Sequence, residues 1–99
     1  MTPTIERFSE MAKETLLVAL PNSALVICEP TSNSAAYIEY ETDRMICRLT
    51  YWEKGSLHYI GIDFPSGVER FTQDTLISAD TDLEMTFLAF QNHALNQNL

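Results

Sequence analysis

The chain has 99 residues, enough for a single hydrophobic core and too few for two, so we predict one domain over residues 1–99. Fourteen acidic against six basic residues give a formal net charge of -8 at pH 7. Because no basic stripe is present to neutralise phosphates, the sequence argues against nucleic acid and against an anionic membrane surface as partners. An acidic protein is instead steered towards cationic partners.

The N-terminal segment predicts an amphipathic helix, with Thr2 as its cap and Pro3 at the first helical position. Apolar residues then recur at spacings of three and four, which places them on one helix face: Ile5, Phe8, Ala12, Leu16, Ala19 and Leu20. Pro21 and Asn22 end this helix. The apolar run 16–20 is too short to cross a membrane and follows acidic residues rather than a basic region, so we expect a cytoplasmic protein without a signal peptide.

The next segments predict strands. Residues 24–29 are an apolar run, and the composition of residues 30–34 predicts a loop after it. Residues 36–41 alternate between apolar and polar, which is typical of a half-exposed strand. A two-residue turn at Thr42-Asp43 would join this strand to the next one and would pair Glu39 with Ile46 on the outer face of the sheet.

A central hairpin is predicted from Arg44 to Phe64, around Lys54-Gly55. Since Gly55 can adopt a positive φ angle, we predict a two-residue turn there. The resulting pairing gives one nearly apolar face that we assign to the core: Met45, Cys47, Leu49, Tyr51, His58, Ile60, Ile62 and Phe64. We expect this apolar pattern to determine the register of the hairpin.

Residues 68–72 predict a fifth strand, and residues 78–84 open a second helix in which Thr81 and Glu84 have the spacing of a capping box. The buried stripe of this helix is Leu83, Phe87, Phe90 and Ala94. The order of elements predicts an α+β fold with an N-terminal helix, a four- to five-stranded antiparallel meander sheet and a C-terminal helix. Both helices pack on one sheet face, and the other face is left open.

No enzyme signature is recognisable: the sequence has no phosphate-binding glycine loop, no zinc-binding helix motif and no pairing of a nucleophile with a base. We therefore predict a protein that is not an enzyme and needs no metal or cofactor. His58 is interpreted as a packed core residue, and His93 is given a structural role near a helix C-terminus, where a cation is mildly favourable. Cys28 and Cys47 lack metal-like spacing and are expected to be reduced, buried thiols.

The outer face of the predicted sheet is the first candidate binding surface, because aromatic residues and arginine surrounded by acids are typical of a binding hot spot with a polar rim. The alternative is a solvated face in which Trp52 pairs with Leu57 and Arg48 with Asp63. The expected members are Tyr37, Glu39, Glu41, Arg44, Ile46, Arg48, Thr50, Trp52, Leu57, Tyr59 and Asp63.

Acidic clusters form the second candidate surface. Residues 14–43 contain no lysine or arginine, and neither do residues 71–99, whose acids are Asp74, Asp80, Asp82 and Glu84. Such clusters would suit a basic partner, for example a nuclease whose own site has to attract nucleic acid.

The central hairpin resembles the TriTu-type CdiI immunity proteins of bacterial contact-dependent growth inhibition. The resemblance rests on the segment Tyr37 to Asp43, on a following strand that ends in Asp63, and on the motif Arg48-x-Thr50-x-Trp52-Glu53-x-Gly55. The size, the acidity and the order of helices and strands are similar as well.

The resemblance implies an immunity protein that binds and neutralises the C-terminal toxin domain of a CdiA effector, typically an RNase. In this family the toxin is associated with elongation factor Tu and attacks tRNA. The hypothesis that competes with it is an acidic secretion chaperone, a class with a similar order of elements whose members are usually dimers that hold an extended effector segment.

Overall fold

The computed structural model describes residues 2–28 and 34–96. In this part of the chain the elements are α1 (Ile5–Glu14), α2 (Leu16–Ala19), β1 (Ser23–Cys28), β2 (Ala35–Glu41), β3 (Met45–Trp52), β4 (Ser56–Asp63), β5 (Glu69–Leu76) and α3 (Asp80–Asn96). Glu29, the expected end of the first strand, and the expected loop at residues 30–34 lie outside the described residues, except for Ser34.

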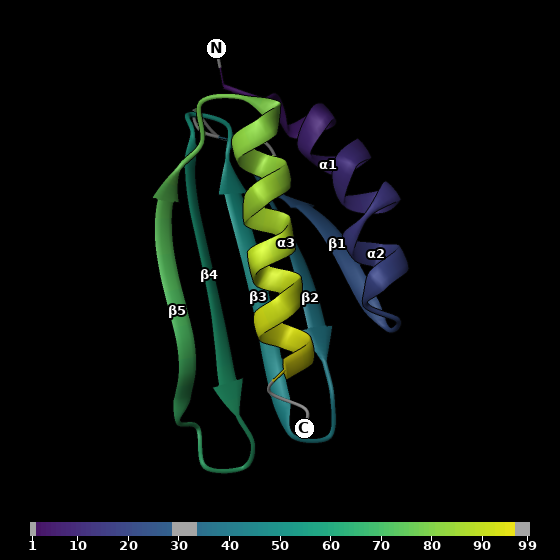
Figure 1. Cartoon of the computed structure of the whole chain (residues 1–99), viewed down its shortest axis with the longest axis vertical. Helices are drawn as coiled ribbons and strands as arrows, with labels where there is room; N and C mark the ends of the chain where they lie inside the picture. The colour runs from purple at the N-terminus through teal and green to yellow at the C-terminus, as the bar shows by residue number, and fades with distance from the viewer. Residues whose placement is uncertain (1, 29–33, 97–99) are drawn as a thin grey trace.

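All five strands form one antiparallel sheet in the order β1-β2-β3-β4-β5, which confirms the predicted meander and the α+β fold. Figure 1 shows the strands side by side in chain order, with α3 along the middle of the sheet and α1 and α2 on the β1 side. The helices cover one face, because a sheet with a single apolar face has to bury that face against another layer.

Helix α1 starts two residues later than predicted. Its N-cap is Thr4, whose Oγ1 accepts a hydrogen bond of 3.0 Å from the N–H group of Arg7. Thr2 instead donates to the carbonyl oxygen of Glu53 at 2.9 Å, and the carbonyl of Pro3 accepts from the buried Tyr51 hydroxyl at 2.7 Å. These two hydrogen bonds attach residues 2 and 3, which precede α1, to the end of the central hairpin. This attachment explains why residues 2 and 3 are not part of the helix.

The predicted apolar stripe of the first helix is confirmed, although the helix is interrupted at Thr15 and resumes as α2. Ile5, Phe8, Ala12, Leu16 and Leu20 are buried, together with Met11, whereas Ala19 is partly exposed. The stripe faces the sheet, and the charged residues of α1 remain in solvent.

The turn between β2 and β3 lies at Asp43-Arg44, one residue later than predicted. Thr42 stabilises it: its N–H group donates to the Met45 carbonyl at 2.8 Å, and its Oγ1 accepts from the N–H groups of Arg44 and Met45. The pairing is shifted by two residues, so Glu39 lies opposite Arg48 rather than Ile46. A shift of two preserves the faces, and the assignment of this pair of strands to core and solvent was therefore right.

The register between β3 and β4 was predicted wrongly by one residue. The loop has three residues, 53–55, and the Gly55 N–H group donates to the Trp52 carbonyl at 2.8 Å while Gly55 adopts a φ angle of 109°. Tyr51 therefore lies opposite Leu57. The longer loop turns every side chain of β4 to the opposite face.

As a result, the predicted core residues of β4 point outward and the predicted outer residues point inward. Leu57 and Tyr59 are buried, whereas His58, Ile60 and Ile62 are half-buried on the outer face. The apolar pattern did not determine this register, because β4 has large apolar residues on both of its faces.

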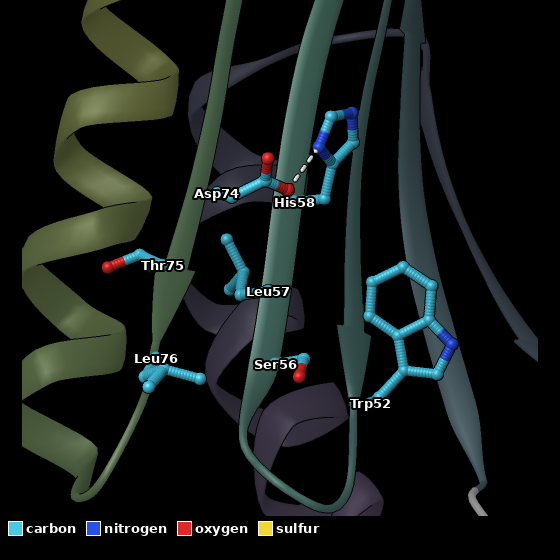
Figure 2. Close-up of a pocket in the computed structure, with 7 residues that line it drawn as sticks. All are labelled: Trp52, Ser56, Leu57, His58, Asp74, Thr75 and Leu76. Atoms are coloured by element: carbon cyan, nitrogen blue, oxygen red, sulfur yellow. Dashed lines mark hydrogen bonds and ion pairs between the residues drawn. The ribbon is translucent and has the colours of Figure 1, made fainter.

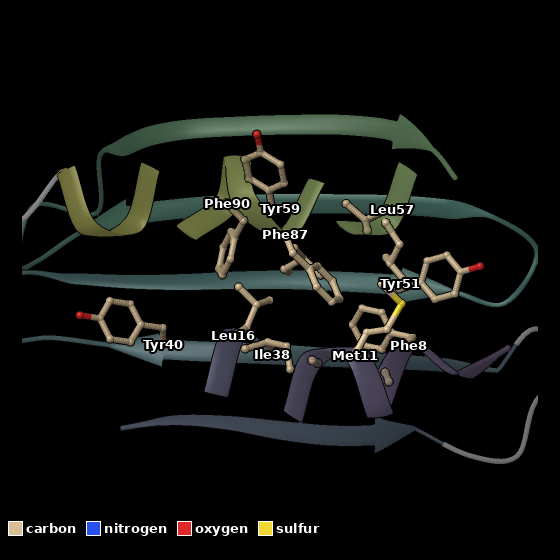
Figure 3. Close-up of a cluster of buried hydrophobic side chains, with 14 of the residues drawn as sticks. Phe8, Met11, Leu16, Ile38, Tyr40, Tyr51, Leu57, Tyr59, Phe87 and Phe90 are labelled. Atoms are coloured by element: carbon tan, nitrogen blue, oxygen red, sulfur yellow. The ribbon is translucent and has the colours of Figure 1, made fainter. Parts of the chain in front are cut away.

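The core lies between the sheet and the helices, and aromatic rings dominate it (Figure 3). Phe8 stacks on Tyr51 with ring centroids 5.3 Å apart and meets Phe87 edge-on at 5.5 Å. Tyr59 meets Phe90 edge-on at 5.5 Å. The stripe predicted for the second helix is confirmed, since the following residues are all buried: Leu83, Phe87, Phe90 and Ala94.

Helix α3 begins at Asp80, so Thr81 lies within its first turn. The prediction that Thr81 caps this helix was therefore wrong. Asp82, also in this first turn, binds the segment before the helix: its Oδ2 accepts from the N–H group of Ser78 at 3.1 Å and from the Ser78 hydroxyl. These hydrogen bonds lower the pKa of the Asp82 carboxyl.

Strand β5 extends to Leu76 and is longer than the predicted 68–72. Phe71 on β5 lies opposite Gly61 on β4, and the pairing of the two strands shifts register between Gly61 and Ile62. A Cβ atom on Gly61 would lie 2.4 Å from the Phe71 ring, so this position needs a glycine for the ring to lie over the strand. On its other side, the Phe71 ring stacks on His93 with centroids 5.0 Å apart.

Candidate partner-binding surface

The face of the sheet opposite the helices, called here the outer face, is not covered by any helix or strand of residues 2–28 and 34–96. Because side chains alternate along a strand, the pairing determines its members. They are Ala24, Val26, Cys28, Ala35, Tyr37, Glu39, Glu41, Ile46, Arg48, Thr50, Trp52, Ser56, His58, Ile60, Ile62, Glu69, Thr72, Asp74 and Leu76.

Near the middle of the outer face, an arginine is bound within the sheet. Arg48 donates from Nε and Nη2 to Oε2 of Glu39 on the neighbouring strand, and its Cζ lies 4.3 Å from the centroid of the Tyr37 ring. The hydrogen bond that Arg48 donates to Glu39 raises the pKa of the Arg48 guanidinium. Arg48 thus has both an aromatic and a carboxylate partner inside the protein.

The predicted alternative pair of Arg48 with Asp63 is not formed. Asp63 accepts from the Ser66 hydroxyl at 2.7 Å and from Arg70 Nη2 at 2.9 Å, at the far end of β4. The Ser66 hydrogen bond, followed by Arg70, lowers the pKa of the Asp63 carboxyl. The other predicted pair, Trp52 with Leu57, is also wrong, because Leu57 belongs to the core.

Two strands carry a histidine and an aspartate side by side on the outer face. His58 on β4 lies opposite Asp74 on β5, and Nδ1 of His58 is 2.7 Å from Oδ1 of Asp74. The Asp74 side chain is 85% exposed and that of His58 is 34% exposed. The interpretation of His58 as a core residue was therefore wrong.

A shallow pocket adjoins this pair at the end of the sheet where the 53–55 loop lies. Figure 2 shows Trp52 on β3 and Leu76 on β5 on either side of β4, which carries Ser56 and His58. The lining residues are Trp52, Ser56, Leu57, His58, Asp74, Thr75 and Leu76.

The Asp74–His58 pair has the composition of two members of a hydrolase triad, but the third member is not in place. Ser56 lies on the same strand face, two residues before His58, and the described structure shows no hydrogen bond between the two side chains. Figure 2 shows the imidazole directed away from Ser56. A serine becomes nucleophilic through a hydrogen bond to its base, so this geometry contains no activated nucleophile.

The other predicted site residues are distributed over different parts of the molecule. Tyr59 is only 4% exposed and packs in the core, where burial raises its pKa, so its prediction as an outer-face residue was wrong. Asp80 binds Arg7 at 2.8 Å and, like Asp82 and Glu84, belongs to α3 on the helix side.

The outer face thus contains part of each predicted surface. Eight of the predicted residues lie on it: Tyr37, Glu39, Glu41, Ile46, Arg48, Thr50, Trp52 and Asp74. Asp63 lies opposite the core residue Met45, so its prediction as an outer-face residue was wrong. Of the C-terminal acids, Asp74 alone joins the aromatic residues. Sequence reasoning missed His58 and Leu76 as members of this surface; residues 72–75 are all polar, so no period-2 pattern extended the predicted strand to Leu76.

The cysteines differ in environment. Cys47 is buried beneath the helices, and burial raises the pKa of its thiol to about 12. Cys28 is exposed at the end of β1, so its expected burial was wrong. The described residues include neither a cluster of three or more potential metal ligands nor a helix long and apolar enough to cross a membrane.

Fold and surface together define a small acidic protein with helices on one face of a meander sheet and an open second face of aromatic and charged residues. The chain belongs to the TriTu immunity protein family, whose family model matches residues 5–92. This match extends from α1 into α3 and confirms the resemblance found at the central hairpin. A comparison with curated proteins finds no match. Membership of an immunity protein family implies a toxin as the partner.

Proposed function

We propose that this immunity protein binds the C-terminal toxin domain of a CdiA effector and occludes its active or substrate-binding surface. The toxin is proposed to be an RNase that acts on tRNA, with elongation factor Tu associated through the toxin. The observation that carries this proposal is the family match over residues 5–92. Because tRNA is the substrate, the inhibition takes place in the cytoplasm.

The charge of the chain supports a basic partner. An RNase has to attract a polyanion, so the surface around its active site is basic, and a net charge of -8 on the inhibitor favours encounter with that surface. The outer face supplies the contacts that follow the encounter, with Trp52 and Tyr37 as aromatic anchors and acids around them. On this proposal the protein acts by stoichiometric binding and not by catalysis.

The experiment begins with the gene immediately upstream of the one for this chain. The C-terminal domain that it encodes is purified and mixed with the immunity protein, and binding is measured by calorimetry together with cleavage of total tRNA. We expect a stoichiometric complex in which tRNA cleavage is abolished. Adding elongation factor Tu to the same cleavage assay tests whether the toxin depends on it.

Salt dependence tests the electrostatic part of the proposal. Between about 0.1 M and about 1 M salt the Debye length falls from about 10 Å to about 3 Å, so the association rate is expected to decrease over this range. An association rate that does not change with salt would contradict charge-steered binding.

The secretion chaperone hypothesis makes different predictions for the same materials. A chaperone would bind an unfolded effector segment, would not inhibit a folded toxin domain, and would be a dimer in size-exclusion chromatography with light scattering. Binding to the unfolded segment alone would replace the immunity proposal.

A further inference from the structure

The pocket between Trp52 and Asp74, called here the Trp52–Asp74 pocket, combines an apolar and an acidic part. Trp52 and Leu76 give it apolar walls, and Leu76 is 79% exposed. Asp74 gives it a carboxylate that is 85% exposed. Leu76 lies on an edge strand, across β4 from the single tryptophan of the chain, and leaves apolar area accessible to a partner.

Hydrogen bonding holds the carboxylate in a defined position. His58 Nδ1 lies 2.7 Å from Oδ1 of Asp74, and it is the one side-chain partner of Asp74 within the described part of the chain. The second oxygen, Oδ2, remains able to accept hydrogen bonds from a group that enters the pocket.

Within residues 2–28 and 34–96, the other acids seen in ion pairs are already bound by arginine. Glu39 accepts from Arg48, Asp63 from Arg70, and both Asp80 and Glu10 from Arg7. Asp74 has a histidine partner instead, and no arginine or lysine lines the pocket beside it. Asp74 can therefore form an arginine ion pair with a partner molecule.

The outer face already contains an arginine that is bound by both an aromatic ring and a carboxylate. Arg48 lies 4.3 Å from the ring centroid of Tyr37 while its guanidinium is bound by Glu39. The Trp52–Asp74 pocket offers the same two elements, an aromatic ring and a carboxylate, on strands separated by β4. Tryptophan is the strongest of the aromatic residues in attracting a cation to its ring.

We infer that the Trp52–Asp74 pocket receives an arginine side chain of the toxin; this inference rests on the proposed function. The aliphatic part of the arginine packs against Leu76, its guanidinium plane lies against Trp52, and its N–H groups donate to Asp74. Arginine is preferred to lysine because a planar guanidinium can stack on the indole and bind a carboxylate through two N–H groups. An RNase binds substrate phosphates with such side chains, so capture of one arginine would also prevent RNA binding.

Three variants of the immunity protein test the pocket against the purified toxin domain. Asp74→Asn removes the charge and keeps the size, Trp52→Leu removes the ring and keeps an apolar side chain, and Glu84→Gln is the matched control on α3. Circular dichroism first establishes that each variant is folded. We expect each pocket variant to weaken binding by about tenfold or more and the control to change it by less than about twofold.

A double-mutant cycle then identifies the arginine. Each arginine of the toxin domain is changed to alanine and to lysine, and binding is measured against the original protein and against Asp74→Asn. One toxin arginine is expected to lose its effect on binding in the Asp74→Asn background, with lysine failing to replace it.

The outcomes separate this inference from the proposed function. Failure of the unmodified protein to bind the toxin domain overturns both. Binding that is intact in the two pocket variants overturns the pocket and leaves the immunity function standing. Loss of binding in the pocket variants without coupling to any toxin arginine overturns the assignment of arginine as the occupant.

Discussion

The contact between Gly61 and Phe71 leads to a prediction about stability. Gly61→Ala is expected to destabilise the protein when Phe71 is present and to stabilise it when Phe71 is replaced by alanine. A Cβ atom on Gly61 would lie 2.4–2.6 Å from three atoms of the Phe71 ring, so in Gly61→Ala the ring has to leave its place over β4. The ring would then lose its contact with Tyr59 and its stacking on His93, whose centroids lie 6.0 and 5.0 Å away.

The expected magnitude combines two opposing effects. Overpacking of this kind costs about 1–3 kcal/mol, whereas replacing a glycine within a strand by alanine gains about 0.5–1 kcal/mol of backbone entropy. The net loss in the free energy of unfolding for Gly61→Ala is therefore about 0–2.5 kcal/mol. When Phe71 is alanine as well, the clash is gone, and Gly61→Ala is expected to stabilise the protein by about 0.5–1 kcal/mol.

Urea unfolding followed by far-ultraviolet circular dichroism provides the measurement, on the original protein, Gly61→Ala, Phe71→Ala and the double variant. Equal destabilisation by Gly61→Ala with and without the Phe71 ring would refute the reasoning, because the cost would then not come from that ring. The contact matters for the surface as well, since it packs β5, the strand that carries Asp74, against the core.

Three further predictions concern a thiol, a buried hydrogen bond and a carboxyl group. Cys28 is expected to react quickly with an aromatic disulfide reagent at neutral pH, whereas Cys47, whose pKa burial raises to about 12, reacts only after unfolding; two fast thiols would contradict this. Tyr51→Phe leaves a buried main-chain carbonyl without its donor and should lower the free energy of unfolding by about 1–3 kcal/mol in urea titrations. Asp82 has a folded-state pKa below its unfolded value of about 3.9, so its stabilising effect is present above that pH and is lost as the pH falls through the folded pKa. Asp82→Asn should accordingly be less stable than the original protein at pH 7, with the difference vanishing in acid; a difference that is independent of pH would point to a cause other than the charge-dependent hydrogen bonds from Ser78.

The elements that could be predicted are those with one clear apolar face. The buried face of α1 and the inward residues of β2 follow from periodicity, because charged or other polar residues occupy most of the opposite positions. Strand β4 has Leu57 and Tyr59 on one side and Ile60 and Ile62 on the other, so the length of its loop decides which side is buried. That length depends on Gly55 closing a three-residue loop, a choice that hydrophobicity does not encode.

The candidate site was predictable to the same extent. Trp52, Arg48 and Glu39 lie on strands whose faces were assigned correctly, and they were placed on the outer face. The pair of His58 and Asp74 requires both the register of β4 and the full length of β5, and neither is visible in the sequence pattern. The N-terminal cap was predicted wrongly for a similar reason. The chain before α1 is held by hydrogen bonds of Pro3 with Tyr51 and of Thr2 with Glu53, which are distant in the sequence.

The alternation of side chains along β3 divides its residues between two tasks that can change separately. One set of side chains packs against the helices: Met45, Cys47, Leu49 and Tyr51. The other set faces the solvent: Ile46, Arg48, Thr50 and Trp52. Substitution at every second position can therefore give the outer face a new specificity without opening a cavity in the core. A scaffold built in this way can diversify to match new partners while its own fold is maintained by the intervening residues.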